Sequence, residues 1–85
     1  RIDIVLNEEQ REKITLFDAA TIPMETFPIK INQINTIDGV KLIGDAGWVA
    51  YRLSCTEPLL RIYSESNNQQ SVDSLIDHVR TFLGV

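Results

Sequence analysis

The sequence predicts an α+β domain in which a four-stranded antiparallel sheet packs against two helices. Two observations point to this class. Apolar and polar residues alternate through much of residues 28–65, interrupted by turn residues, which is typical of half-buried strands. A segment on either side of this region carries helix signals instead. The resulting order, a helix, several antiparallel strands and a second helix, indicates a layered domain with both helices on one face of the sheet.

The chain opens with an apolar alternation that suggests a short strand or an extended lead-in: Ile2, Ile4 and Leu6. A helix is expected to follow over Glu8–Asp18. Its start is well marked, because the Asn7 side chain can accept from a free backbone N–H and Gln10 can reach back to the cap.

The next segment leads into the sheet. Pro23 and Pro28 bracket an irregular connector. Ile29 and Ile31 then alternate with polar residues, and a bulge near Gln33 would bring the isoleucines that follow back into phase.

Turn residues divide the rest of the sheet into strands. Asp38-Gly39 predicts a two-residue type I′ hairpin turn, which requires positive φ. A second turn at Gly44–Gly47 leads into a strand over Trp48–Leu53. After an interruption that ends at Pro58, the last strand is expected over Leu59–Glu65.

The final segment predicts an amphipathic helix. Its apolar residues recur at steps of three and four and form one broad stripe: Val72, Leu75, Ile76, Val79, Phe82 and Leu83. Ser66, Asn67 or Asn68 can cap its start, and Gly84 suits the position after its end. His78, the only histidine, borders this stripe and is expected to be a surface or boundary residue, since no nucleophile or acid is paired with it in sequence.

Composition limits what the chain can do. Its 85 residues form one small domain, which buries roughly 60% of the surface that its unfolded chain exposes and leaves little room for an enclosed pocket. The formal net charge of −4 and the pI of about 4.8 argue against a general nucleic-acid surface, yet they allow one phosphate held by local donors. A single cysteine forms no internal disulfide and fits a reducing compartment.

We expect the protein to be soluble and cytoplasmic. No signal peptide is visible, and no apolar run approaches the roughly 18 residues of a membrane span; no membrane partner is therefore expected. Because the chain begins at Arg1 and its only methionine is the internal Met24, we expect a piece excised from a larger protein.

The interruption RLSCTEP, residues 52–58, contains the residue types of an anion site. In extended backbone Arg52, Ser54 and Thr56 would share one face, and a turn would curl them around an anion. Arg61 can lie across from Arg52 if the two strands pair, and an arginine fork matches two phosphate oxygens. On composition alone, a hairpin loop whose Ser and Thr side chains bond their own backbone stays the favoured interpretation.

A family resemblance changes that balance. The stretch RLSCTEPLLRIYSES resembles the phosphate-binding signature of the α-D-phosphohexomutase superfamily, Arg-x-Ser-Gly/Asn-Thr-Glu-Pro followed by an arginine on the next strand. The preceding TIDGVKLIGDAGWVAYR is similar to that family's Asp-Gly hairpin and Trp-containing strand. The resemblance covers residues 31–85 and is most specific over 38–65. It implies the fourth, C-terminal domain of a phosphoglucomutase/phosphomannomutase-type enzyme, with a TATA-box-binding-protein-like fold of four strands and two helices.

Carried over by position, the resemblance implies that Arg52, Ser54, the backbone N–H of Cys55 and Thr56 bind the phosphate, with Arg61 in a supporting role. It implies no catalytic residue and no metal ligand in this chain. Cys55 departs from the usual Gly or Asn. If that position needs positive φ, the cysteine costs about 1 kcal/mol or more of strain, and its side chain narrows the loop.

For the whole enzyme, the resemblance implies intramolecular phosphoryl transfer that interconverts hexose 1-phosphate and hexose 6-phosphate. This domain would hold the non-reacting phosphate and help to close the active-site cleft. The implied partners are a hexose phosphate and the other three domains of the same enzyme. Magnesium is expected in the full-length enzyme, and no cofactor is expected in this chain. Because the nucleophile, metal ligands and general acid lie in those other domains, the isolated chain is expected to be inactive as a mutase.

Several alternatives stay open at this stage. The chain could be a stand-alone phosphometabolite-binding module, or a structural or protein-interaction domain. Trp48 could be a ligand platform, although packing against a helix is favoured, and the charges of Glu8–Lys13 are most simply a solvated helix face. Cys55 could be a reactive thiol beside two arginines, although a small turn residue is favoured. Glucose, mannose and glucosamine phosphates are all open as substrates, with the last strands closer to the glucose/mannose branch.

Overall fold

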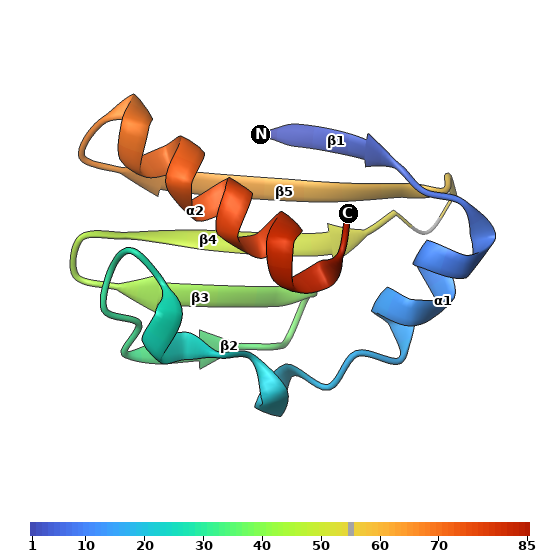
Figure 1. Ribbon diagram of the computed structural model, residues 1–85, viewed down its shortest axis with the longest axis horizontal. Helices are drawn as coiled ribbons and strands as arrows, with labels where there is room; N and C mark the ends of the chain where they lie inside the picture. The colour runs from blue at the N-terminus through green and yellow to red at the C-terminus, as the bar shows by residue number, and fades with distance from the viewer. Residues whose placement is uncertain (55) are drawn as a thin grey trace.

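The fold is one antiparallel sheet of five strands, in the order β1-β5-β4-β3-β2, with its helices on one side (Figure 1). The computed structural model describes residues 1–54 and 56–85. The strands are β1 (Ile2–Val5), β2 (Gln33–Asn35), β3 (Val40–Gly44), β4 (Gly47–Leu53) and β5 (Leu59–Ser66), and the helices are α1 (Glu8–Thr15) and α2 (Gln69–Leu83). Two short 3-10 turns, Ala19–Thr21 and Met24–Thr26, lie in the connector. The predicted α+β class is confirmed.

The predicted number of four strands is wrong, because the N-terminal lead-in joins the sheet. β1 pairs with β5 in an antiparallel register that sets Ile2 across from Ile62 and Ile4 across from Leu60. The apolar alternation seen in the sequence therefore points the two isoleucines of β1 at the same core as the inner residues of β5. Immediately after β1, the Leu6 backbone N–H donates to the Pro58 carbonyl at 2.8 Å.

α2 builds the core by covering β4 and β5. Leu75 and Val79 on the helix are fully buried, as are Leu60 and Ile62 on β5. Of the three candidate caps, Asn68 is the one used, since its side chain accepts from the Ser71 backbone N–H. Gly84 ends the helix with a φ of 76°, as predicted. Within the described chain, neither helix is long and apolar enough to cross a membrane.

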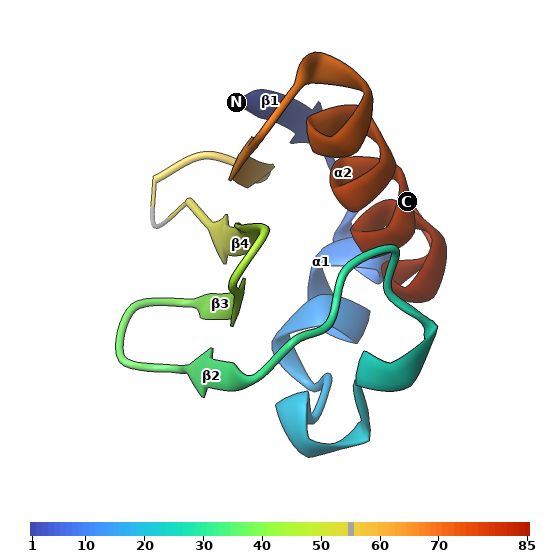
Figure 2. The same ribbon diagram turned by 90° about the vertical axis from the view of Figure 1, so that its left-hand side faces the viewer.

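α1 is shorter than predicted and lies beside one end of the sheet, next to the β4–β5 loop (Figure 1). The capping box of Asn7 and Gln10 is confirmed. The helix ends at Thr15 rather than Asp18, because the Asp18 side chain accepts from the Ala20 N–H and so begins the first 3-10 turn. Figure 2 shows α1 and α2 on the same side of the sheet, and the described helices leave the opposite face uncovered.

The β2–β3 connection differs from the predicted type I′ turn. Gly39 has a φ of +77°, but among the described residues positive φ is confined to glycines, so Asp38 does not have it. Residues 36–39 instead form a wider turn, in which the Asn35 side chain accepts from the Ile37 N–H at 2.9 Å. The bulge predicted near Gln33 is in keeping with the hydrogen bonds at the start of β2. Gln33 pairs with Ile43, and the preceding Asn32 N–H also donates to the Ile43 carbonyl at 2.9 Å, so two successive residues lie opposite one residue of β3. The Gly44–Gly47 turn is confirmed.

Candidate functional site

Two arginines flank the β4–β5 loop on the uncovered face of the sheet. The β4–β5 register places Arg52 directly across from Arg61, which confirms the expected pairing. Their neighbours in sequence, Tyr51 and Ile62, point into the core. Because side chains alternate between the faces of a strand, both guanidinium groups lie on the side that no described helix covers. Like charges directly opposite one another destabilise a sheet unless an anion offsets them.

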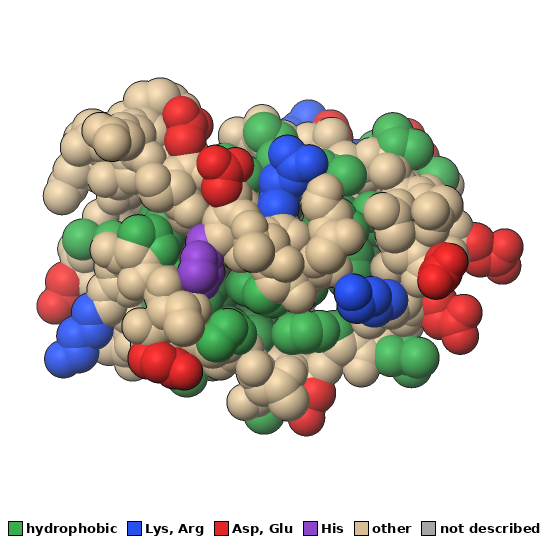
Figure 3. Space-filling model, viewed as in Figure 1, with side chains coloured by type: hydrophobic (Ala, Val, Ile, Leu, Met, Phe, Trp, Pro, Cys, Tyr) green, Lys and Arg blue, Asp and Glu red, His purple; other side chains and the backbone are tan. Residues whose placement is uncertain are grey.

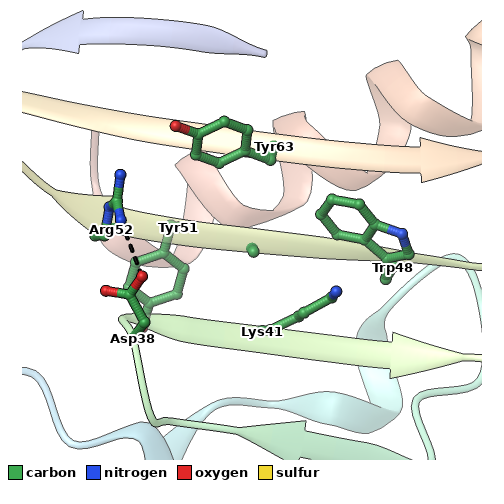
Figure 4. Close-up of a pocket in the computed structure, with 7 residues that line it drawn as sticks. Asp38, Lys41, Trp48, Tyr51, Arg52 and Tyr63 are labelled. Carbon is green, nitrogen blue, oxygen red and sulfur yellow. Dashed lines mark hydrogen bonds and ion pairs between the residues drawn. The ribbon is translucent and has the colours of Figure 1, made fainter.

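Arg52 already has one anionic partner. Its Nη1 donates to Oδ2 of Asp38 at 2.9 Å, and both side chains are partly exposed (Figure 4). The Asp38 carboxylate raises the pKa of the Arg52 guanidinium, first through its charge and then through this hydrogen bond, with a smaller contribution from Tyr63. The turn that carries Asp38 is pressed against β4, since a Cβ at Gly39 would collide with the Tyr51 carbonyl oxygen and approach the Arg52 Cβ at 3.0 Å. This close contact seats Asp38 beside Arg52.

Arg61 is less completely paired. Its Nε is the one buried side-chain nitrogen or oxygen, among the residues the structure describes, that has no hydrogen-bond partner. Asp3 lies across from Arg61 in the β1–β5 register, but its carboxylate pairs with Arg1 at 3.4 Å. A buried guanidinium N–H without an acceptor is costly.

The sequence predicted that Ser54 and Thr56 share one face with Arg52, but in the structure these two loop residues differ in exposure. Ser54 is buried, with 7% of its surface exposed, and its backbone N–H donates to the Leu59 carbonyl at 2.9 Å. Thr56 is exposed. Cys55, the third predicted loop contact, lies outside the described residues. The structure thus brings Arg52 and Arg61 together, and the Arg52 guanidinium is turned toward Asp38.

A third arginine, which the sequence pattern did not predict, reaches the loop from α1. Arg11 Nη1 donates to the Glu57 carbonyl at 3.2 Å and lies 3.5 Å from the Ser54 carbonyl. The prediction that the charges of Glu8–Lys13 form only a solvated helix face is therefore wrong for this residue, which is half-buried. No local signal could have shown it, because the contact joins residues more than forty positions apart.

A shallow hollow of about 330 Å³ extends from Arg52 across the uncovered face. It is lined by Asp38, Lys41, Trp48, Ala50, Tyr51, Arg52 and Tyr63 (Figure 4). Trp48 was expected to pack against a helix, and this expectation is wrong. Its side chain is half-buried on the face away from both helices, where Lys41 Nζ lies 4.3 Å from the ring centroid (Figure 4).

His78 does not line this hollow and is instead packed against residues of the connector before β2. It lies among apolar side chains on the α2 side of the molecule (Figure 3). Its ring centroid is 4.4 Å from that of Phe27, and its Nε2 is 2.8 Å from Thr26 Oγ1. The Thr26 hydroxyl donates its own hydrogen to the Pro23 carbonyl, so the His78 Nε2 carries the proton between them. The boundary role predicted for His78 is in keeping with these contacts.

Comparisons with known proteins identify relatives of the chain. The family described as "Phosphoglucomutase/phosphomannomutase, C-terminal domain" matches residues 6–82. A phosphoglucomutase/phosphomannomutase of Thermococcus kodakarensis is 42% identical over 45 residues, which is 53% of this chain and 10% of that protein. A phosphoglucosamine/phosphogalactosamine mutase of Sulfurisphaera tokodaii is 40% identical over 57 residues, or 67% of the chain and 12% of the relative.

A third relative aligns over most of the chain. A probable phosphoglucosamine mutase of Pyrococcus horikoshii is 32% identical over 76 residues, which is 89% of this chain and 16% of that protein. All three relatives carry the names of mutases, and the chain spans only 10% to 16% of their length.

Proposed function

Because the chain belongs to the family of phosphoglucomutase/phosphomannomutase C-terminal domains, we propose that it binds the phosphate group of a hexose phosphate. In this proposal it is one domain of an enzyme that interconverts hexose 1-phosphate and hexose 6-phosphate by intramolecular phosphoryl transfer. The domain holds whichever phosphate is not reacting and helps to close the cleft. A TATA-box-binding-protein-like fold is part of the same proposal.

The observation that carries the proposal is the cross-strand pair of Arg52 and Arg61. The two arginines share the uncovered face beside the loop, since they lie directly across from each other on β4 and β5. A phosphate dianion offers several acceptor oxygens and would offset two like charges at once. One ligand would therefore bridge the two arginines.

The loop residues would complete the binding site. We propose that the Ser54 and Thr56 hydroxyls and the backbone N–H of Cys55 donate to the remaining phosphate oxygens. Ser54 lies directly beyond β4, and Thr56 is exposed at the bend, where a ligand has access to it. Arg11 would hold the loop from the side opposite the ligand through its bond to the Glu57 carbonyl.

A site that reads only phosphate suits a mutase, because the substrate presents either of its phosphates in turn. In the proposed enzyme a phosphoserine in another domain donates its phosphoryl group to the sugar. The bisphosphorylated intermediate then reorients and returns its other phosphate to that serine. Throughout, this domain would bind the spectator phosphate and exclude water on closing.

The magnesium ion of such an enzyme would have to be held elsewhere. Among residues 1–54 and 56–85, no group of three or more His, Cys, Asp or Glu side chains converges on a point that could hold a metal ion. The described residues of this chain therefore do not fit a magnesium site. The same division of labour predicts that the isolated chain does not isomerise hexose phosphates.

Titration of the chain with inorganic phosphate, followed by NMR, tests the proposal. A few charge-assisted hydrogen bonds of ~1.5–3 kcal/mol each, set against an association cost of ~4–15 kcal/mol, give a Kd on the order of millimolar. The amides around the loop should shift. Arg52→Ala and Arg61→Ala should each weaken binding by about tenfold or more, since each removes a charged donor.

Arg80→Ala is the matched control, because Arg80 lies on α2 and donates to the Val85 carbonyl at 2.9 Å. This variant should bind phosphate as the unaltered chain does. Equal affinity in all three variants, or no response of the loop amides to phosphate, would refute the phosphate-binding proposal.

A further inference from the structure

Tyr63 lies next to the arginine pair on the uncovered face of the sheet. It follows Arg61 by two residues on β5, so the two side chains point to the same side. In the β4–β5 register Tyr63 pairs with Ala50, which stands two residues before Arg52 on β4. Tyr63 is therefore the diagonal neighbour of Arg52, at a separation that aromatic and other long side chains can span. Because Ala50 carries only a methyl group, it does not separate the two, and all three line the same hollow.

The phenol hydroxyl of Tyr63 and the guanidinium group of Arg52 are directed toward each other (Figure 4). Arg52 gives its Nη1 to the Asp38 carboxylate at 2.9 Å, and a second nitrogen points toward β5, on the side of the Tyr63 hydroxyl. Asp38 is the main cause of the raised pKa of Arg52, and Tyr63 adds a smaller effect through its own charge and hydrogen bonding. The phenol oxygen is thus close enough to Arg52 to meet a ligand bound there.

The chemistry of the two groups decides what the hydroxyl can do. An arginine side chain carries donors only, so the Tyr63 hydroxyl can interact with it only through the lone pairs of its oxygen. The hydroxyl hydrogen is not used in that contact. An anion on the guanidinium edge away from Asp38 would bring acceptor oxygens beside this hydrogen, and hydrogen bonds to an ionised oxygen are short and strong.

The ring of Tyr63 is also partly fixed in place. Its side chain is half-buried on the face of β5. A donor that is already ordered loses less conformational entropy when it binds than a fully exposed side chain does.

We propose that Tyr63 is a further phosphate-binding residue, whose hydroxyl donates to an oxygen of the phosphate held by Arg52 while its own oxygen accepts from the guanidinium group. The inference rests on the proposed function, because it requires the phosphate to bind at Arg52. It adds a donor from the middle of β5 to the donors of the loop. Recognition stays confined to the phosphate, since this contact reaches no other part of a ligand.

Tyr63→Phe tests the contact, because phenylalanine keeps the ring and removes only the hydroxyl. The variant and the unaltered chain are titrated with inorganic phosphate and followed by NMR. Loss of one hydrogen bond to an ionised group should weaken phosphate binding about five- to tenfold. At saturation the loop amides should still shift, because the arginines are unchanged. A tyrosine that served only to pack against its neighbours would lose no affinity on this substitution.

Tyr51→Phe is the matched control, since Tyr51 is the other tyrosine of the chain and is buried. It loses the same hydroxyl group from the opposite face of β4 and should bind phosphate as the unaltered chain does. The unaltered chain gives a second measurement that needs no variant. Phosphate should shift the NMR signals of the Tyr63 ring and leave those of the Tyr51 ring nearly in place.

The outcomes separate this inference from the proposal beneath it. If phosphate shifts the loop amides but Tyr63→Phe binds it as tightly as the unaltered chain, the tyrosine contact is refuted and the phosphate site stands. Equal losses in Tyr63→Phe and Tyr51→Phe, or a Tyr63 ring that does not respond to phosphate, would also refute the contact. If phosphate leaves every amide unshifted, both proposals fail together.

Discussion

At Arg52, two anions compete for one guanidinium group. Asp38 holds the Nη1 edge at 2.9 Å, while the proposed phosphate would take the edge that faces Arg61. The pair lies on the surface, where solvent and salt screen it and an ion pair contributes little to stability. Asp38 therefore orders Arg52 at little gain in stability, but its negative charge opposes an incoming phosphate.

Replacing Asp38 tests which effect is larger. A phosphate beside the Asp38 carboxylate meets a repulsion on the order of 1 kcal/mol in water, and salt screens this repulsion. Asp38→Asn should therefore bind inorganic phosphate a few-fold more tightly, and the gain should shrink as sodium chloride is raised. Isothermal titration calorimetry at two ionic strengths measures this.

Asp45→Asn provides the comparison for that experiment. Asp45 lies in the other tight turn and accepts from Asn32 Nδ2 at 3.2 Å, so its removal changes net charge equally without altering Arg52. Its phosphate affinity should stay close to that of the unaltered chain. Weaker binding in Asp38→Asn would mean that ordering of Arg52 outweighs repulsion.

The positions of individual side chains were predictable only where the strand pattern decides them. Arg52 and Arg61 were placed across from each other from their spacing around the loop, and the register agrees. The same alternation put Trp48 on the face of Ala50 and Arg52. Which face the helices cover depends on the whole topology, so the sequence favoured a packed tryptophan where the structure has a half-buried one beside the hollow.

At the scale of elements, α1 is tied to the β4–β5 loop by Arg11. Its Nη1 bonds to the Glu57 carbonyl at 3.2 Å, which fixes part of a loop whose backbone would otherwise have fewer partners. Arg11→Met keeps the apolar stem and removes the donors. We expect faster hydrogen exchange at the amides of residues 54–57 and a several-fold loss of phosphate affinity, with little change in the midpoint of global unfolding.

Lys13→Met serves as the control on the same helix, since Lys13 is exposed. Its loop exchange rates should match those of the unaltered chain. If Arg11→Met leaves both loop exchange and phosphate affinity unchanged, the loop does not depend on α1.

Local chemistry predicts which helices and turns form, but it does not always predict where they end. The Asn7 capping box, the Asn68 cap and Gly84 all act as predicted, because caps bond within a few residues of themselves. Asp18 could extend a helix or begin a turn, and it does the second. The number of strands was missed because pairing of β1 with β5 joins distant parts of the chain, which periodicity cannot reveal.

At the scale of the whole molecule, one buried phenol makes the free energy of unfolding fall at alkaline pH. Tyr51 is 5% exposed and packs edge-on to Phe82, with 6.1 Å between ring centroids. Burial raises its pKa from the ordinary value of 10.0 to about 12. A raised pKa means that the folded state favours the protonated phenol. The contribution of the buried, protonated phenol to the free energy of unfolding is complete below pH 10 and is lost as the pH rises toward 12.

Chemical denaturation between pH 9 and pH 12 measures this effect, with Tyr51→Phe as the reference. Each pKa unit corresponds to about 1.4 kcal/mol, so the unaltered chain should lose up to about 3 kcal/mol more than the variant over this range. Parallel stability curves for the two proteins would show that Tyr51 ionises as readily in the folded state as in the unfolded state.

The borders of the sheet have a consequence for how the domain behaves at high concentration. The outermost strands are β1, with 4 residues, and β2, with 3. Each presents a short row of free amide and carbonyl groups, and the β1 border also carries the charged Arg1–Asp3 pair. Such borders are poor templates for a foreign strand. The domain can thus expose one broad side of its sheet to a ligand without inviting neighbouring copies to join it and grow into fibres.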